Sequence, residues 1–171
     1  KTLYPVASQT RQDFFNLARV YIDLTLRPRL QRETFLQEGH HLEFTVPDDP
    51  GSDLTISGVV YNEMKGAYSS PDALMFKAIQ EALFPKTPYA CDSGGDPDVI
   101  PSLTYEAFRA FHRTYYSPSN ARFFLYGDIP TEDHLCFLAE ELAGFGRVTV
   151  TSAIPPQIGR ASCRERVWIP V

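Results

Sequence analysis

The sequence is short of several features that would each point to a different class of protein. It has three cysteines in 171 residues, too few and odd in number for a disulfide framework, so we expect a reducing compartment. It has no run of about 18 apolar residues, so we expect no membrane span. Acidic residues outnumber basic ones by 21 to 16, and a chain of net charge −5 without a basic stripe is not expected to bind nucleic acid.

The composition that remains is that of a globular domain with a core: 43% of the residues are hydrophobic and 13% aromatic. The spacing of apolar residues and breakers predicts helices over 13–26, 33–38, 62–70, 104–116 and 131–145, and a further helix that starts at 70–72 and includes Leu83. β-prone runs predict strands over 42–46, 54–61 and 121–126, the first two joined by a turn-rich segment at 47–53. We therefore expect an α+β fold with a largely antiparallel sheet backed by helices.

Side-chain patterns add detail to three of these helices. The broad apolar arc of residues 13–26 predicts a helix in a buried layer. Asn62 is a candidate N-cap for the helix over 62–70. In the helix over 131–145, we expect the core-facing side chains to be those of Leu135, Phe137, Leu138 and Leu142.

The two ends of the sequence divide the chain into three parts. Because it begins at Lys1 within what reads as a continuing segment, we expect it to be cut from a longer protein, with residues 1–150 forming one partial domain and 151–157 the start of a linker. Residues 158–171 turn abruptly basic and resemble the translation of a common sequencing adapter, so we expect this tail to be non-native. The alternative is a basic tail that binds an acidic partner.

Considered one at a time, the candidate residues do not indicate a metal site or a catalytic site. The four histidines are His40, His41, His112 and His134, and no two have the i, i+4 spacing that places a pair of zinc ligands on one helix face. We expect His112 to be a packed core residue or a surface residue of a helix, and His134 a solvated residue near a helix start. Residues 93–97 (SGGDP) predict a tight turn that lets the backbone pass close to a neighbour. On spacing alone, Glu63 is a surface glutamate.

Several motifs taken together are more specific. They are GVVYNEMKG at 58–66, SGGDP at 93–97 followed by Ile100-Pro101, Phe111-His112, YSPSNAR at 116–122, YPVAS at 4–8 and QEG at 37–39. Taken in their order along the chain, these motifs resemble those of the pitrilysin/insulinase zinc metallopeptidases, and within that family those of the presequence-protease-like branch. The resemblance covers nearly all of residues 1–150 and implies a partial metallopeptidase half-domain.

The resemblance also implies a zinc site. In this family two histidines of a His-x-x-Glu-His motif bind zinc, the glutamate between them is the general base, and a distant glutamate is the third ligand; zinc-bound water is the nucleophile. The distant glutamate matches Glu63, and Glu38 is a candidate to support it from outside the ligand set. The chain has no His-x-x-Glu-His, so it carries one zinc ligand of three and no catalytic residue.

These implications give two readings of function. The first is a piece of a zinc metalloendopeptidase that degrades unstructured peptides, inactive without the remaining parts of the same full-length chain, in a bacterial cytoplasm or an organelle matrix. The second is a non-catalytic homologous half that shapes a chamber or binds a partner. An unrelated α+β binding domain is a third and weaker reading. For the first, Glu63 should not point to open solvent away from any hollow where another helix could lie.

Overall fold

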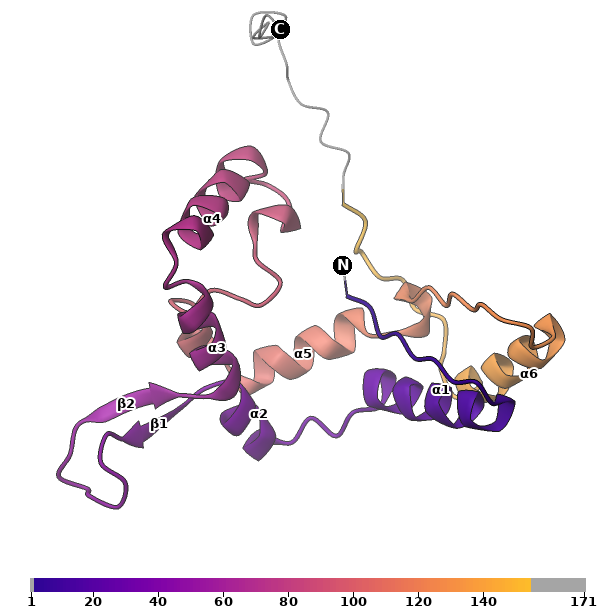
Figure 1. Ribbon diagram of the computed structural model, residues 1–171, viewed down its shortest axis with the longest axis horizontal. Helices are drawn as coiled ribbons and strands as arrows, with labels where there is room; N and C mark the ends of the chain where they lie inside the picture. Colours follow the sequence, from indigo (N-terminus) through magenta and orange to yellow (C-terminus); the bar gives the residue numbers. More distant parts are fainter. Residues whose placement is uncertain (1, 155–171) are drawn as a thin grey trace, which may run out of the picture.

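The computed structural model describes residues 2–154, which form an open arrangement of helices with one β-hairpin (Figure 1). The suspected non-native tail at 158–171 lies outside these residues. In chain order, the main elements are α1 (Arg11–Leu26), α2 (Arg32–Glu38), β1 (His41–Phe44), β2 (Leu54–Ser57), α3 (Val59–Ala67), α4 (Pro71–Leu83), α5 (Tyr105–Tyr115) and α6 (Thr131–Leu142). Short 3-10 turns lie at Pro88–Ala90, Ile100–Ser102 and Pro118–Asn120. The α+β class is confirmed.

The sheet is antiparallel and, in the part of the chain that is described, has two strands. His41 pairs with Ser57 and Phe44 with Leu54. Thr45 donates its N–H to the Asp53 carbonyl at 2.8 Å, which closes the expected turn between the strands. The hairpin projects away from the helices (Figure 1), so the apolar face of the sheet stays exposed, with Leu42 at 64% and Leu54 at 58%.

The expected strand over 121–126 is wrong for the described structure. These residues run as an extended segment that pairs with no other strand within 2–154. Their exposure alternates, with Phe124 at 89% and Tyr126 at 90% but Phe123 at 42% and Leu125 at 39%. The β-prone pattern is there, but a strand also needs a neighbour whose backbone groups it can pair with.

Helix α5 connects two groups of helices. At one end, α1 packs on α6, where Phe15 and Phe137 lie 5.0 Å apart between ring centroids and Arg19 pairs with Glu141 at 2.6 Å. At the other, α2 contacts α3, and Phe35 of α2 lies 5.4 Å from Phe108 of α5. His112 of α5 reaches back to α1, with its Nε2 2.8 Å from the Thr25 carbonyl oxygen.

The core is smaller than the sequence predicts. Within residues 2–154, the buried hydrophobic side chains are those of Ile22, Ile100 and Phe137. The expectation of a buried layer for α1 is wrong, because Val20 is 51% exposed and Leu24 63%. Leu135 of α6 is also outside the core, at 60% exposure, while Phe137 is buried as expected. Each helix has the expected apolar stripe, but only part of it meets another element.

This exposure predicts how the 171-residue chain behaves by itself. We expect broad, weakly cooperative thermal unfolding and association that increases with concentration, because uncovered apolar surface and an unpaired β-prone segment favour both. Light scattering and a thermal scan measure this. Phe124→Lys with Tyr126→Lys should reduce association without loss of helical circular dichroism, since both side chains are almost fully exposed. A sharp single transition from a monomer would contradict the expectation.

The N-terminal segment is held to the end of α5 by two tyrosines. The hydroxyls of Tyr4 and Tyr116 lie 3.1 Å apart, and the Tyr116 ring stacks on His112 at 4.6 Å. The pKa of Tyr4 is raised to about 12, mainly by partial burial and secondly by the hydrogen bond with Tyr116. The folded form therefore favours a protonated Tyr4 hydroxyl.

The raised pKa of Tyr4 predicts a stability loss in strong base. Its contribution is complete below the ordinary tyrosine pKa of about 10 and is lost as the pH rises towards the folded-state pKa of about 12. Tyr4→Phe should make stability less dependent on pH in this interval, by circular dichroism at stepped pH. Tyr126→Phe is the control, because that side chain is 90% exposed. Equal behaviour of the two variants would show that the Tyr4 contact is not formed.

Candidate functional site

Helix α3 carries Glu63 and begins where it meets the end of α2. Gly58 precedes the helix with a φ of 155°, and a Cβ at this position would overlap the backbone of Gly39. Tyr61 donates its N–H to the Gly39 carbonyl at 3.4 Å. Only glycine allows so close an approach of the two backbones. This also corrects the expected N-cap: the helix starts three residues earlier than Asn62, after Gly58, and the Asn62 side chain donates back to the Ser57 hydroxyl at 3.5 Å.

Glu63 lies on the side of α3 that nothing described covers. The partly buried side chains Tyr61, Met64 and Tyr68 mark the packed side of the helix. Val59 and Ala67, one turn before and after Glu63, are exposed like Glu63 itself. Its carboxylate makes no hydrogen bond or ion pair with any residue in 2–154. One free carboxylate therefore sits between an apolar and a small residue on an open helix face.

The other end of α3 is held by a polar cluster. Tyr68 ends the helix, and the Lys77 ammonium of α4 lies 5.4 Å from the centroid of its ring. Lys77 also pairs with Asp96 at 2.5 Å. The hydrogen bond to Asp96 raises the pKa of Lys77, and the same bond, with the Asp98 N–H, lowers the pKa of Asp96. Partial burial and the nearby charge of Asp92 raise the pKa of Tyr68. Both members of the ion pair are thus charged across the neutral range.

The supporting role expected for Glu38 remains a prediction. Glu38 is the last residue of α2 and its side chain is exposed. Its carboxylate has no hydrogen bond or ion pair among the described contacts. The following residue, Gly39, is the one against which α3 begins. Glu38 is thus on the element next to α3 in space, although nothing described orients it towards Glu63.

The histidines do not form a metal site in the described residues. Three of them place a ring nitrogen 2.8–2.9 Å from a backbone carbonyl oxygen: His40 with Leu103, His41 with Leu36 and His112 with Thr25. His112 is partly buried by its contact with α1, so of the two expected settings the packed one is nearer to the structure. The expected solvated position of His134 is wrong, because it is 7% exposed and packs against Phe14 and Phe15. Contact between α1 and α6, which local sequence does not reveal, buries it.

The donor set does not by itself fit a bound zinc ion. Within residues 2–154, no three histidine, cysteine, aspartate or glutamate side chains come together in a way that could hold a metal. Zinc in proteins takes three or four such ligands. Glu63 is of the right chemical type and is free, but a single carboxylate is one ligand and not a site.

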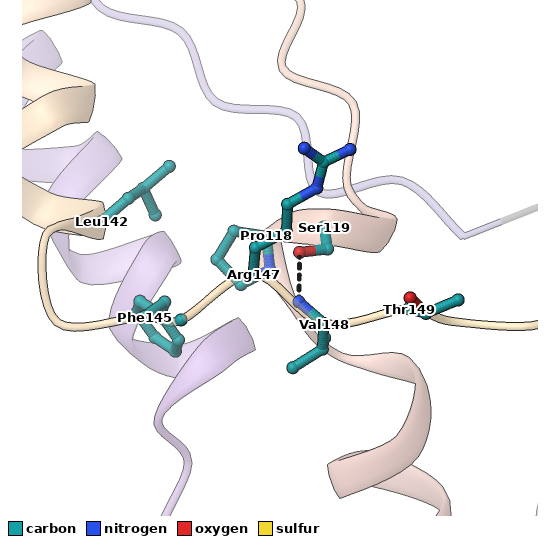
Figure 2. Close-up of a pocket in the computed structure, with 8 residues that line it drawn as sticks. Pro118, Ser119, Leu142, Phe145, Arg147, Val148 and Thr149 are labelled. Atoms are coloured by element: carbon teal, nitrogen blue, oxygen red, sulfur yellow. Dashed lines mark hydrogen bonds between the residues drawn. The ribbon is translucent and has the colours of Figure 1, made fainter.

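One hollow of the described structure is remote from Glu63. A depression of about 510 Å³ lies between the turn at Pro118–Asn120 and the segment that follows α6. Figure 2 shows Leu142 and Phe145 on one side and the hydrogen bond from the Val148 N–H to the Ser119 hydroxyl, at 3.1 Å, on the other. α6 and α3 lie at opposite ends of the molecule (Figure 1), so this hollow belongs to the packing of the chain around α6.

Sequence reasoning missed two residues near the site, Lys77 and Asp96. They are 19 positions apart and belong to an exposed helix and a loop, so no periodic pattern connects them. The available signal was the aspartate within SGGDP, a loop whose glycines already predicted close backbone contact.

No helix within residues 2–154 is long and apolar enough to cross a bilayer.

Comparison with known proteins gives a consistent result. A family model described as "Peptidase M16 inactive domain" matches residues 102–170. The chain is 48% identical over 168 residues to Protein HypA of Clostridium perfringens and 44% identical over 177 residues to the mitochondrial presequence protease of Danio rerio. It is 48% identical over 147 residues to presequence protease 1, chloroplastic/mitochondrial, of Arabidopsis thaliana.

These alignments cover most of the chain but little of each relative. They include 96%, 99% and 85% of this chain, respectively, and 17%, 17% and 13% of the relatives. The chain therefore spans between about one eighth and one sixth of the length of these relatives. The family-model match begins at residue 102, after α3 and Glu63. The resemblance found in the sequence motifs is confirmed: over most of its length the chain is similar to presequence proteases, and residues 102–170 match a domain of the M16 (pitrilysin/insulinase) peptidases.

Proposed function

We propose that the chain is part of a zinc metalloendopeptidase and that Glu63 supplies one of its three protein ligands to zinc. The observation that carries the proposal is the setting of Glu63. A free carboxylate lies on an open helix face between Val59 and Ala67, within the motif GVVYNEMKG. An ordinary surface glutamate does not need an apolar setting, whereas a ligand that a second helix must cover does.

The other two ligands and the general base would come from a segment outside these residues. Zinc, when bound, polarises a carbonyl group and activates water. This chain alone has neither the histidines in a suitable arrangement nor a base at the site. Its own contribution is to hold one carboxylate on a helix that is fixed at both ends, by Gly39 at its start and by the Tyr68 cluster at its end.

The substrates, partners and compartment are also proposals. Unstructured peptides are the proposed substrates, and the remaining parts of a longer chain are the proposed partners; nucleic acid and membranes are not. The relatives named as mitochondrial or chloroplastic presequence proteases support this substrate class and a matrix compartment. The HypA relative leaves a bacterial cytoplasm as the other proposed location.

The alternative function is that of a non-catalytic half that shapes a chamber or binds a partner. The inactive-domain description of residues 102–170 favours it for α5, α6 and the residues beyond. We retain the catalytic proposal for the earlier residues, because α3 and Glu63 precede that match. The coding sequence upstream of Lys1 discriminates the two: a His-x-x-Glu-His motif there supports the peptidase, and its absence from an intact upstream sequence supports the non-catalytic half.

The proposal predicts opposite behaviour for the chain and for the longer protein. Isothermal titration of the 171-residue chain should show no tight one-to-one zinc binding, and the chain should cleave no peptide, because it carries one ligand. The longer protein should bind one zinc, and Glu63→Gln should weaken that binding by at least about a hundredfold, since a first ligand matters at least as much as its supporting residues.

The matched control is Glu140→Gln in α6. Glu140 is an exposed helical glutamate at the other end of the molecule and should leave zinc affinity unchanged. Tight stoichiometric zinc binding by the isolated chain would sink the proposal, and so would a Glu63→Gln variant of the longer protein that binds zinc as well as the parent does.

A further inference from the structure

Helix α4 has one firm polar contact with the loop that follows it. Of its 13 residues, only Ala73 and Lys77 are not exposed. The Lys77 ammonium meets Asp96 at 2.5 Å, and the two side chains are only 27% and 28% exposed. Water and salt weaken the attraction within a partly buried ion pair less than they weaken that within an exposed pair. It joins α4 to the loop across 19 residues of sequence.

Asp96 also orders the loop itself. Its second carboxylate oxygen accepts the Asp98 N–H at 2.9 Å, and its carbonyl accepts the N–H of Val99 and of Ile100. Ile100 is 5% exposed and is one of the few buried apolar side chains described. Asp92 fixes the start of the loop by accepting the Gly94 N–H at 2.8 Å. The position of the glycines between Asp92 and Asp96 is therefore determined on both sides.

This ordered loop touches α3 directly beside Glu63. Gly94 packs so closely on Met64 that a Cβ at position 94 would overlap the Met64 sulfur and lie 2.9 Å from its methyl carbon. The approach is this close because Gly94 has no side chain, so a larger residue at position 94 would have to displace the end of the Met64 side chain. Lys77 makes a second contact with α3 through the Tyr68 ring. Two points on the packed side of α3 thus depend on one ion pair.

We propose that Lys77 and Asp96 are positioning residues that hold α3, and with it the carboxylate of Glu63, by seating Gly94 against Met64. The inference rests on the proposed function only in taking Glu63 as the side chain whose placement matters. A helix of nine residues is not stable by itself in water, so contacts on its packed side decide its orientation and its opening. On the open side, nothing described holds it.

The test uses the longer protein without zinc and measures amide hydrogen exchange in α3. Lys77→Met keeps the length of the side chain and removes its charge, and Asp96→Asn keeps the acceptor for the Asp98 N–H. Both should speed exchange in residues 59–67 by about tenfold, a shift of about 1.4 kcal/mol. Exchange in α1 should change by less than about twofold, because α1 packs on α6, away from the ion pair. Lys77→Arg, which keeps the cation, should remain near the parent.

The control is Lys86→Met, which removes an exposed lysine just beyond α4 that has no ion pair among the described residues. Unchanged exchange in α3 for Lys77→Met and Asp96→Asn overturns the inference. A rise of equal size in α1, or in Lys86→Met, or in Lys77→Arg also overturns it, because the effect would then be general loss of stability or of side-chain packing.

Zinc affinity provides the functional readout. In the same protein, Lys77→Met and Asp96→Asn should weaken zinc binding by about tenfold, as expected when a ligand loses its outer support. Unchanged affinity in these variants overturns the link to Glu63. If Glu63→Gln itself leaves zinc affinity unchanged, the proposed function is wrong, while the exchange measurement still decides whether Lys77 and Asp96 hold α3.

Discussion

Uncovered apolar surface is the constraint on which the rest of this structure depends. Burying apolar area stabilises a fold by about 25 cal/mol per Å², and a chain that buries little cannot offset the entropy of ordering its backbone. Among residues 2–154, three hydrophobic side chains are buried, while α4 leaves Leu74, Phe76 and Leu83 more than half exposed. We propose that helices with such faces are parts of a core whose other layer lies outside these residues.

The same constraint explains the setting of Glu63. Its helix is fixed along one side by α2, by the glycine loop and by the Tyr68 cluster, and is open along the other. A carboxylate on the open side is placed to meet whatever covers Val59 and Ala67. We propose that this cover brings histidines, because a carboxylate that enters a core needs a cation or hydrogen-bond donors to compensate for lost water. A metal site shared between two segments meets that need.

The sequence predicted the local structure well, because local signals were strong. The apolar spacing of α1, the glycine after α2, the proline that opens α4 and the Thr104 cap of α5 all act within a few residues. The Thr104 hydroxyl does accept the Ala107 N–H, at 3.1 Å. The start of α3 was placed too late because β-prone Val59 and Val60 read as strand, and the backbone contact between Gly58 and Gly39 overrides that preference.

What the sequence could not provide was contact between distant residues. The burial of His134 depends on α1, and the pairing of Lys77 with Asp96 depends on the path of a loop. The exposure of Leu135 and the lack of a described partner for residues 121–126 depend on which neighbours are present. The role of Glu63 is different again: spacing indicated a surface residue, and only the family motif around it pointed to a ligand.

The most direct test of the central claim is a crystal structure of the longer protein with zinc, with the metal located by anomalous scattering. The account predicts a zinc peak within about 2.2 Å of a Glu63 carboxylate oxygen, with a second helix covering Val59 and Ala67. A structure in which zinc is bound elsewhere and the Glu63 side chain remains in open solvent would contradict it.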